Sequence, residues 1–219
     1  MAGFWFPIQL SILVAASATA TTFIIGVYSA YKLKASNKKT TSVVETLFLL
    51  PLVLPPSVIG FLLLIVFGIN SPVGEFIDFM FGQTILFTKA AAVIASVVVA
   101  FPLMYQAAKT GFSGVNNDIE EAARVDGAGE WKVFYYVSIR LAAKSLMMGI
   151  VLSFTRALGE FGATLMFAGN IPGKTQTIST AIYLALESGE THLAWQYVLV
   201  SISLSFLLLL LIRGMEQRS

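Results

Sequence analysis

The stretch that decides the fold of this chain is Ile8–Tyr31, which reads IQLSILVAASATATTFIIGVYSAY, 24 residues without an Asp, Glu, Lys or Arg. A helix needs roughly 20 apolar residues to cross the hydrocarbon core of a bilayer. Backbone amides in lipid have no water to bond, so a single crossing segment of this length has to be helical. The stretch therefore predicts a transmembrane helix.

Four more stretches follow the same pattern, and they are Val43–Phe67, Ile85–Tyr105, Ser145–Phe167 and Trp195–Ile212. A membrane barrel would instead show strands of about ten residues that alternate apolar and polar side chains. The sequence therefore predicts an all-α, polytopic membrane protein with five transmembrane helices, folded as one domain over residues 1–219.

The composition agrees with a membrane protein and narrows its chemistry. The chain is 57% apolar and 12% charged, against about 45–50% and 25% in soluble domains. A net charge of +2 is too small to indicate a nucleic-acid partner. The absence of Cys excludes disulfides and thiolate metal sites, and no nucleophile–base motif of a membrane enzyme is present. We therefore expect no catalytic residue, metal or cofactor, and no enzymatic activity.

The basic residues indicate the orientation in the cell membrane, because Lys and Arg concentrate in cytoplasmic loops. In a five-helix model, 11 of the 14 basic residues fall on one side: Lys32, Lys34, Lys38, Lys39, Lys109, Arg124, Lys132, Arg140, Lys144, Arg213 and Arg218. Trp5 and Trp195 then mark the opposite interface. We therefore expect the N-terminus outside and the C-terminus in the cytoplasm.

The longest polar stretch, about 106–144, is predicted to be an ordered cytoplasmic loop. Asp118 and Glu121 have the spacing of a capping box, and Gly127 suits the end of the helix that would follow. A second helical pattern places an apolar stripe on Trp131, Phe134, Tyr135 and Val137. These residues fit either a projection that enters a groove on a partner or a loop that folds onto the membrane.

Two charges stand inside the fourth predicted span. Arg156 and Glu160 are four residues apart, on one helix face, where they can form an ion pair. An unpaired charge at this depth costs about 2.5–3.5 kcal/mol, so neither side chain should face lipid. They either line a translocation pathway or its gate, or lock this helix to its neighbours. Gly159 and Gly162 lower the helical propensity around Glu160 and suggest a local hinge or unwinding.

The second predicted span contains Pro51, Pro55 and Pro56, which predict a kink within one helix. Small residues recur every four positions at Ala92, Ser96 and Ala100, which lets helices approach closely. This pattern supports packing within a bundle or between two copies without choosing between them.

The polar loop also resembles a known motif. Glu121-Ala122-Ala123, three residues, Gly127, nine residues and then Val137-Ser138-Ile139-Arg140 is similar to the EAA loop of ABC importer permeases, which has Pro at the position of Arg140. The resemblance implies the MetI-like fold of type I importers. It also implies that the loop docks, as coupling helices, on a separate ATPase subunit. The residues that it assigns to coupling are Asp118, Glu121, Ala122, Ala123, Asp126, Gly127 and Trp131.

Within that family the chain resembles the molybdate permeases, whose relatives carry sulfate and tungstate. The resemblance rests on 154–170, on Ile171–Thr177 and on Leu50–Ser57. It implies import of molybdate or a similar oxyanion by alternating access. The implied partners are a second copy of the chain, two ATPase subunits (ModC-like) and an external substrate-binding protein (ModA-like). The alternatives are a sulfate or tungstate permease and, from another class, a stand-alone carrier driven by an ion gradient.

Overall fold

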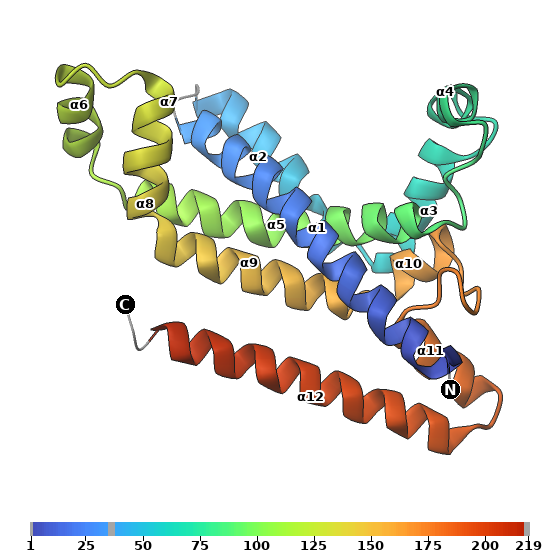
Figure 1. The fold of residues 1–219 in the computed structure, drawn as a ribbon. Coiled ribbons are helices and arrows are strands. Elements are labelled where there is room, and N and C mark those ends of the chain that lie inside the picture. The colour runs from blue at the N-terminus through green and yellow to red at the C-terminus, as the bar shows by residue number, and fades with distance from the viewer. Residues whose placement is uncertain (1, 35–37, 217–219) are drawn as a thin grey trace.

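The computed structural model describes the backbone of residues 2–34 and 38–216 and the side chains within 3–34 and 41–210. Every regular element in this part of the chain is helical, which confirms the all-α prediction (Figure 1). The side chains of Lys38, Lys39, Arg213 and Arg218, and the last two residues of the fifth predicted span, lie outside the described side chains.

The elements follow one another along the chain as α1 (Ala2–Lys34), α2 (Lys38–Val53), α3 (Pro56–Phe67), α4 (Pro72–Phe81), α5 (Lys89–Ser113), α6 (Asn117–Val125), α7 (Glu130–Lys132), the π-helix η1 (Val133–Ser138), α8 (Ile139–Leu141), α9 (Ala143–Leu158), α10 (Gly162–Phe167), α11 (Ile178–Glu187) and α12 (Thr191–Glu216).

Three of the described helices, α1, α5 and α12, are long and apolar enough to cross a membrane on their own. Two further pairs qualify only when each bent pair is one span: α2 with α3, bent by 115°, and Glu130–Leu141 with α9, bent by 76°. The count of five therefore stays a prediction.

The second predicted span is broken, so the prediction of one kinked helix is wrong. Helix α2 tolerates Pro51 in its interior but ends at Val53, and α3 begins at Pro56. Two consecutive prolines remove two amide donors, and Pro56 occupies the first helical position, where the missing donor costs nothing. The chain therefore stops one helix and starts another.

The fourth predicted span is also interrupted. Helix α9 ends at Leu158 and α10 begins at Gly162, so the unwinding suggested by the two glycines is present. Helix α5 continues past Gln106, the first residue of the predicted loop, to Ser113, and the bounds of that loop stay a prediction. Ala108 and Phe112 on these extra turns are buried against Val27 and Ala30 of α1, and this packing keeps them helical.

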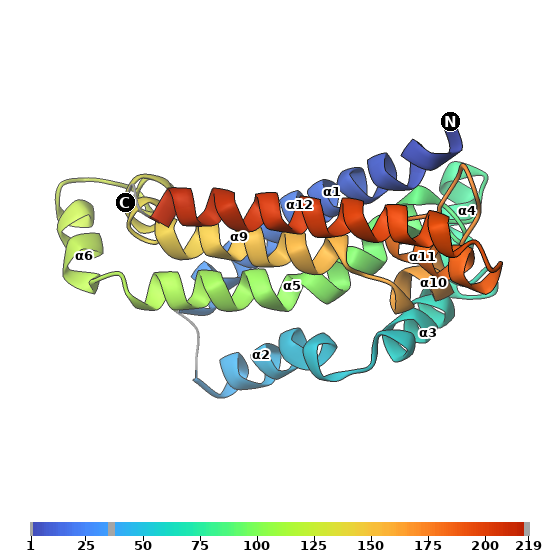
Figure 2. The ribbon, with the colours of Figure 1, turned by 90° about the horizontal axis from the view of Figure 1, so that it is seen from below.

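Helices α1, α5 and α9 form the centre of the bundle. Ala92, Ser96 and Ala100 are buried within the chain, so their small side chains serve packing inside the bundle. Ser153 of α9 donates a hydrogen bond to the Ala100 carbonyl at 3.4 Å. Helix α12 runs along one side and is mostly exposed (Figure 2).

The shorter helices gather at the two ends of the bundle. Helices α6, α7 and α8 lie at one end, and α3, α4, α10 and α11 lie at the other (Figures 1 and 2). Lys32 and Lys34, at the end of α1, therefore lie at the same end as Arg124, Lys132 and Arg140. The structure therefore brings these basic residues of the two predicted cytoplasmic loops to the same end of the bundle.

Candidate functional site

The first half of the site is α6, and its start differs from the predicted capping box. Asn116, not Asp118, is the N-cap: its Oδ1 accepts from the Asp118 amide at 2.9 Å. Asn is among the best N-cap residues, and Asn116 has the extended backbone that an N-cap needs. Asp118 instead lies in the first turn, where its negative charge is favourable beside the helix N-terminus.

The end of α6 is the one that Gly127 predicts. Its φ is +88°, in the left-handed region that favours glycine. The Gly127 amide donates to the Arg124 carbonyl, and the Ala128 amide donates to the Ala123 carbonyl, both at 3.0 Å. A Cβ at position 127 would meet no atom within 4 Å, so here glycine serves backbone conformation and not packing within the chain.

The outer face of α6 is free within the described chain. Asp118, Glu121, Ala122, Asp126 and Gly127 are exposed, Ala123 is half-buried, and Val125 is 87% exposed. Trp131 is exposed as well, on the neighbouring α7. The structure thus brings the predicted coupling residues together on a projecting surface at one end of the bundle (Figure 2).

The aromatic stripe predicted after α6 has the wrong register. Val133–Ser138 is a π-helix, and its buried side chains are Val133 and Ser138. Phe134 packs against Tyr31 of α1 with ring centroids 4.5 Å apart, whereas Trp131 and Tyr135 are exposed and Val137 is half-buried. Hydrogen bonds from i to i+5 rotate the side chains away from the 3.6-residue period on which the prediction rested.

Glu120 is a buried member of α6 that the sequence analysis did not select. Its carboxylate is 7% exposed and binds Lys34 Nζ at 3.0 Å through Oε2. Oε1 accepts from the Ser138 hydroxyl at 2.8 Å. Lys34 is 86 residues away in the sequence, so no local spacing could have indicated the pair.

A second ion pair ties the far side of α6 to α7. Arg124 Nε and Nη2 donate to the two carboxylate oxygens of Glu130 at 2.8 and 3.2 Å. These hydrogen bonds raise the pKa of the Arg124 guanidinium above its ordinary value, so it remains charged. Exposed pairs stabilise little, but bidentate geometry fixes an orientation.

The other half of the site is the interruption between α9 and α10, where Arg156 and Glu160 form the ion pair that their spacing allows. Arg156 Nη1 lies 2.6 Å from Glu160 Oε2, with the side chains 30% and 1% exposed. Glu160 Oε1 also accepts from the Ala163 amide at 2.9 Å, in the first turn of α10. One carboxylate therefore joins α9 to α10 across the break.

The two helix breaks lie against each other. A Cβ at Gly162 would lie 3.0 Å from the Cβ of Pro56, at the start of α3. A Cβ at Gly60 would lie 2.8 Å from the Cβ of Met166 in α10. Gly162 is thus needed for close approach, whereas a Cβ at Gly159 would meet only the Thr155 carbonyl oxygen, at 3.6 Å.

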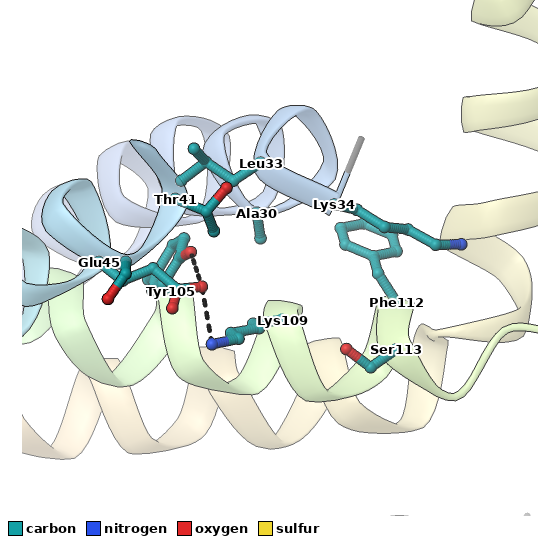
Figure 3. Close-up of a pocket in the computed structure, with 10 residues that line it drawn as sticks. Ala30, Leu33, Lys34, Thr41, Glu45, Tyr105, Lys109, Phe112 and Ser113 are labelled. Carbon is teal, nitrogen blue, oxygen red and sulfur yellow. Dashed lines mark hydrogen bonds and ion pairs between the residues drawn. The ribbon is translucent and has the colours of Figure 1, made fainter. Parts of the chain in front are cut away.

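A cavity of about 300 Å³ lies between the ends of α1, α2 and α5 (Figure 3). In it Glu45 Oε1 binds Lys109 Nζ at 2.7 Å and accepts from the Tyr105 hydroxyl at 2.9 Å. The lysine charge is already paired and a carboxylate lines the wall, so the cavity does not suit an oxyanion. No group of His, Asp and Glu that could hold a metal occurs among the described residues.

Comparisons with known proteins found a family model and several relatives that match most of the chain. The family model for binding-protein-dependent transport system inner membrane components matches residues 22–219. The chain is similar to the putative molybdenum transport system permease protein YvgM of Bacillus subtilis (strain 168), with 53% identity over 210 residues, 96% of this chain and 92% of the relative. Its identity to the molybdenum transport system permease protein ModB of Escherichia coli (strain K12) is 38% over 209 residues, covering 94% and 91% of the two chains.

Solved structures show the same fold at low sequence identity. A bacterial ABC transporter involved in the import of the polysaccharide alginate superposes with a TM-score of 0.80 at 15% identity, covering 100% of this chain and 80% of that one. The MetNI methionine ABC transporter gives a TM-score of 0.69 at 13% identity, covering 98% and 96%. With its apolar helices and a family model that matches most of its length, the chain is a multi-pass membrane protein and belongs to the family of binding-protein-dependent transport system inner membrane components.

Proposed function

We propose that the chain is the permease subunit of an ATP-driven ABC importer for molybdate. It works as a homodimer with two ATPase subunits and an external substrate-binding protein. The whole chain forms one permease domain with five spans, the N-terminus outside and the α6 end in the cytoplasm. The names of the relatives support the substrate, because YvgM and ModB are both described as molybdenum transport system permeases.

The observation that carries the proposal is the construction of α6. It is capped at Asn116, ended at Gly127 and attached on both sides by the ion pairs of Glu120 and Arg124. The buried and paired groups face the chain, while small and apolar side chains such as Ala122 and Val125 face outward. A stiff helix that exposes alanine and valine lets a partner approach its backbone closely, as docking on an ATPase requires.

In this proposal ATP drives alternating access through α6. ATP stabilises the conformation in which the ATPase dimer is closed, because it binds that state better, and hydrolysis resets the equilibrium. Closure moves the docked α6 and thereby turns the central pathway from inward-facing to outward-facing. ATP hydrolysis itself belongs to the partner, so the permease chain is not an enzyme.

The break at Gly159–Phe161 is proposed to belong to the pathway or its gate. Arg156 is 30% exposed and offers positive charge to an oxyanion, while its pairing with Glu160 weakens that attraction. Weak binding suits transport, since a substrate that binds strongly does not leave. The interruption between α9 and α10 also gives this part of the chain a place to bend.

The test is uptake into vesicles that hold the permease and its ATPase, with the binding protein supplied on the face of the membrane opposite the ATPase. We expect ATP-dependent uptake of labelled molybdate, and competition by tungstate and sulfate will rank the oxyanions. Uptake that ignores ATP and follows an imposed ion gradient would contradict the proposal and favour the stand-alone carrier. Stronger competition by sulfate than by unlabelled molybdate would overturn the substrate alone.

A further inference from the structure

The buried carboxylate of Glu120 joins three elements at the α6 end of the molecule. It lies on α6, binds Lys34 at the end of α1, and accepts a hydrogen bond from Ser138 of η1. Glu120 and Ser138 are 5% and 0% exposed, so water does not satisfy these groups in place of the protein partners. In Figure 3 the Lys34 side chain extends away from Glu45 and Lys109, in keeping with its pairing to Glu120.

The three elements differ in how they are held. Helix α6 projects from the bundle and packs on η1, and Arg124 with Glu130 fixes it to α7. These contacts make α6, α7 and η1 a single projecting unit. Helix α1, in contrast, packs along α5 and α9 in the centre of the bundle. A force on the projecting unit reaches α1 through contacts that include the Lys34–Glu120 pair and the Tyr31–Phe134 ring contact.

The two contacts transmit force differently. The tilted rings of Tyr31 and Phe134 move past each other at little cost, because dispersion contacts lack direction. A carboxylate that is buried and bound on both oxygens resists displacement, since separation leaves a buried charge without a partner. The Lys34–Glu120 contact is therefore the stiffer of the two.

We propose that Glu120 is a positioning residue for transport, which passes the movement of the docked α6 unit to α1 through Lys34. The inference rests on the proposed function, because it needs an ATPase that moves α6. It assigns a role to a residue directly before the Glu121–Gly127 motif, on the opposite, inward face of the helix. Loss of the link leaves the docking face intact and separates ATP hydrolysis from transport.

The experiment compares Glu120→Gln and Lys34→Met with the charge exchange Lys34→Glu plus Glu120→Lys. Gln keeps the size of Glu120 and still accepts from Ser138. The control is Lys144→Met, which removes an exposed lysine at the start of α9. Each complex is purified through a tag on the permease, and three quantities are measured: the amount of bound ATPase, the rate of ATP hydrolysis, and molybdate uptake.

We expect both single variants to retain the bound ATPase and its hydrolysis, with molybdate uptake per ATP lower by roughly 2- to 30-fold, the range of coupling changes for residues outside a binding site. The charge exchange should recover part of the loss, and Lys144→Met should match the wild type. A wild-type uptake-to-hydrolysis ratio in Glu120→Gln would overturn the inference. So would loss of the bound ATPase in the single variants, since the residue would then serve assembly. Absence of ATPase from the wild-type complex would instead overturn the proposed function.

A distance measurement gives an independent readout of the link. The chain has no Cys, so labels placed by Asn117→Cys on α6 and Tyr28→Cys on α1 are the only ones in the permease chain. Both positions are exposed. The distance distribution between them should remain narrow in nucleotide-free and ATP-trapped complexes and broaden in Glu120→Gln. An equally narrow distribution in that variant would show that other contacts hold α6 to α1 and would overturn the inference.

Discussion

Replacement of Gly127 by Ala tests the proposed docking helix at its end. Gly127 has a φ of +88°, which directs its own amide and that of Ala128 toward carbonyls in the last turn of α6. A left-handed conformation costs a residue with a Cβ about 1–2 kcal/mol relative to glycine. Because a Cβ at this position meets no atom within 4 Å, steric clash adds nothing to this strain.

The strain weakens docking because the free variant relaxes away from this geometry. The docking geometry is then populated up to about 5- to 30-fold less, and the apparent Kd rises by up to the same factor. Titration of the purified permease with its ATPase subunit measures that Kd, and stimulated ATP hydrolysis reports the same loss at subsaturating ATPase. Membrane insertion should be unchanged, because α6 lies outside the long apolar helices.

Two glycines provide matched controls. Gly82 ends α4 with a φ of +64° and also has open space around it, but it lies at the other end of the molecule. Gly129 is two residues from Gly127, with open space and an ordinary φ of −67°. Neither Gly82→Ala nor Gly129→Ala should change the Kd. Wild-type affinity in Gly127→Ala, or an equal loss in Gly82→Ala, would refute the reasoning.

Three further variants, two of them paired with a comparison variant, test other parts of the account. Ala122→Glu places a long charged side chain on the exposed face of α6 and should abolish stimulated ATP hydrolysis while the permease still inserts; full stimulation would contradict the assignment of that face. Glu160→Ala leaves Arg156 without its partner and the Ala163 amide without its acceptor, so we expect a loss of about 2–4 kcal/mol, below the fully buried limit since Arg156 is 30% exposed. Glu160→Gln, which keeps an acceptor, should lose less stability. Equal thermal stabilities of the wild type and Glu160→Ala in detergent would disprove the bridging role. Gly60→Ala brings a Cβ to 2.8 Å from Met166 and should cost about 1–3 kcal/mol in the same melting assay, whereas Gly3→Ala meets open space and should be neutral.

The features that sequence alone predicted are those set by composition or by short spacing. The uncharged run Ile8–Tyr31 is helical, since a long apolar segment in lipid has no other way to satisfy its backbone. Gly127 ends α6 because few residues tolerate its backbone angle. Arg156 and Glu160 pair because four residues bring two side chains to one helix face.

The features that sequence did not predict depend on the fold or on small energy differences. Lys34 and Glu120 meet only after α1 and α6 are placed together. The π-helix at Val133–Ser138 changes the register that a 3.6-residue period predicts. Asn116 and Asp118 are both good N-cap residues, and the N-cap of α6 lies two residues earlier than the capping-box spacing predicts. Proline in an apolar run indicated a kink, but the structure has a 115° bend between α2 and α3, and α10 packs against α3.

The central claim is that the outer face of α6 contacts an ATPase subunit. Cross-linking from single introduced cysteines tests it most directly, because the chain has none of its own. Val125 on α6 is 87% exposed, and Phe79 on α4, at the opposite end of the bundle, is 88% exposed. We expect Val125→Cys to cross-link to the ATPase and Phe79→Cys not to do so. Failure of Val125→Cys to cross-link in an active complex, or an ATPase cross-link from Phe79→Cys, would contradict the account.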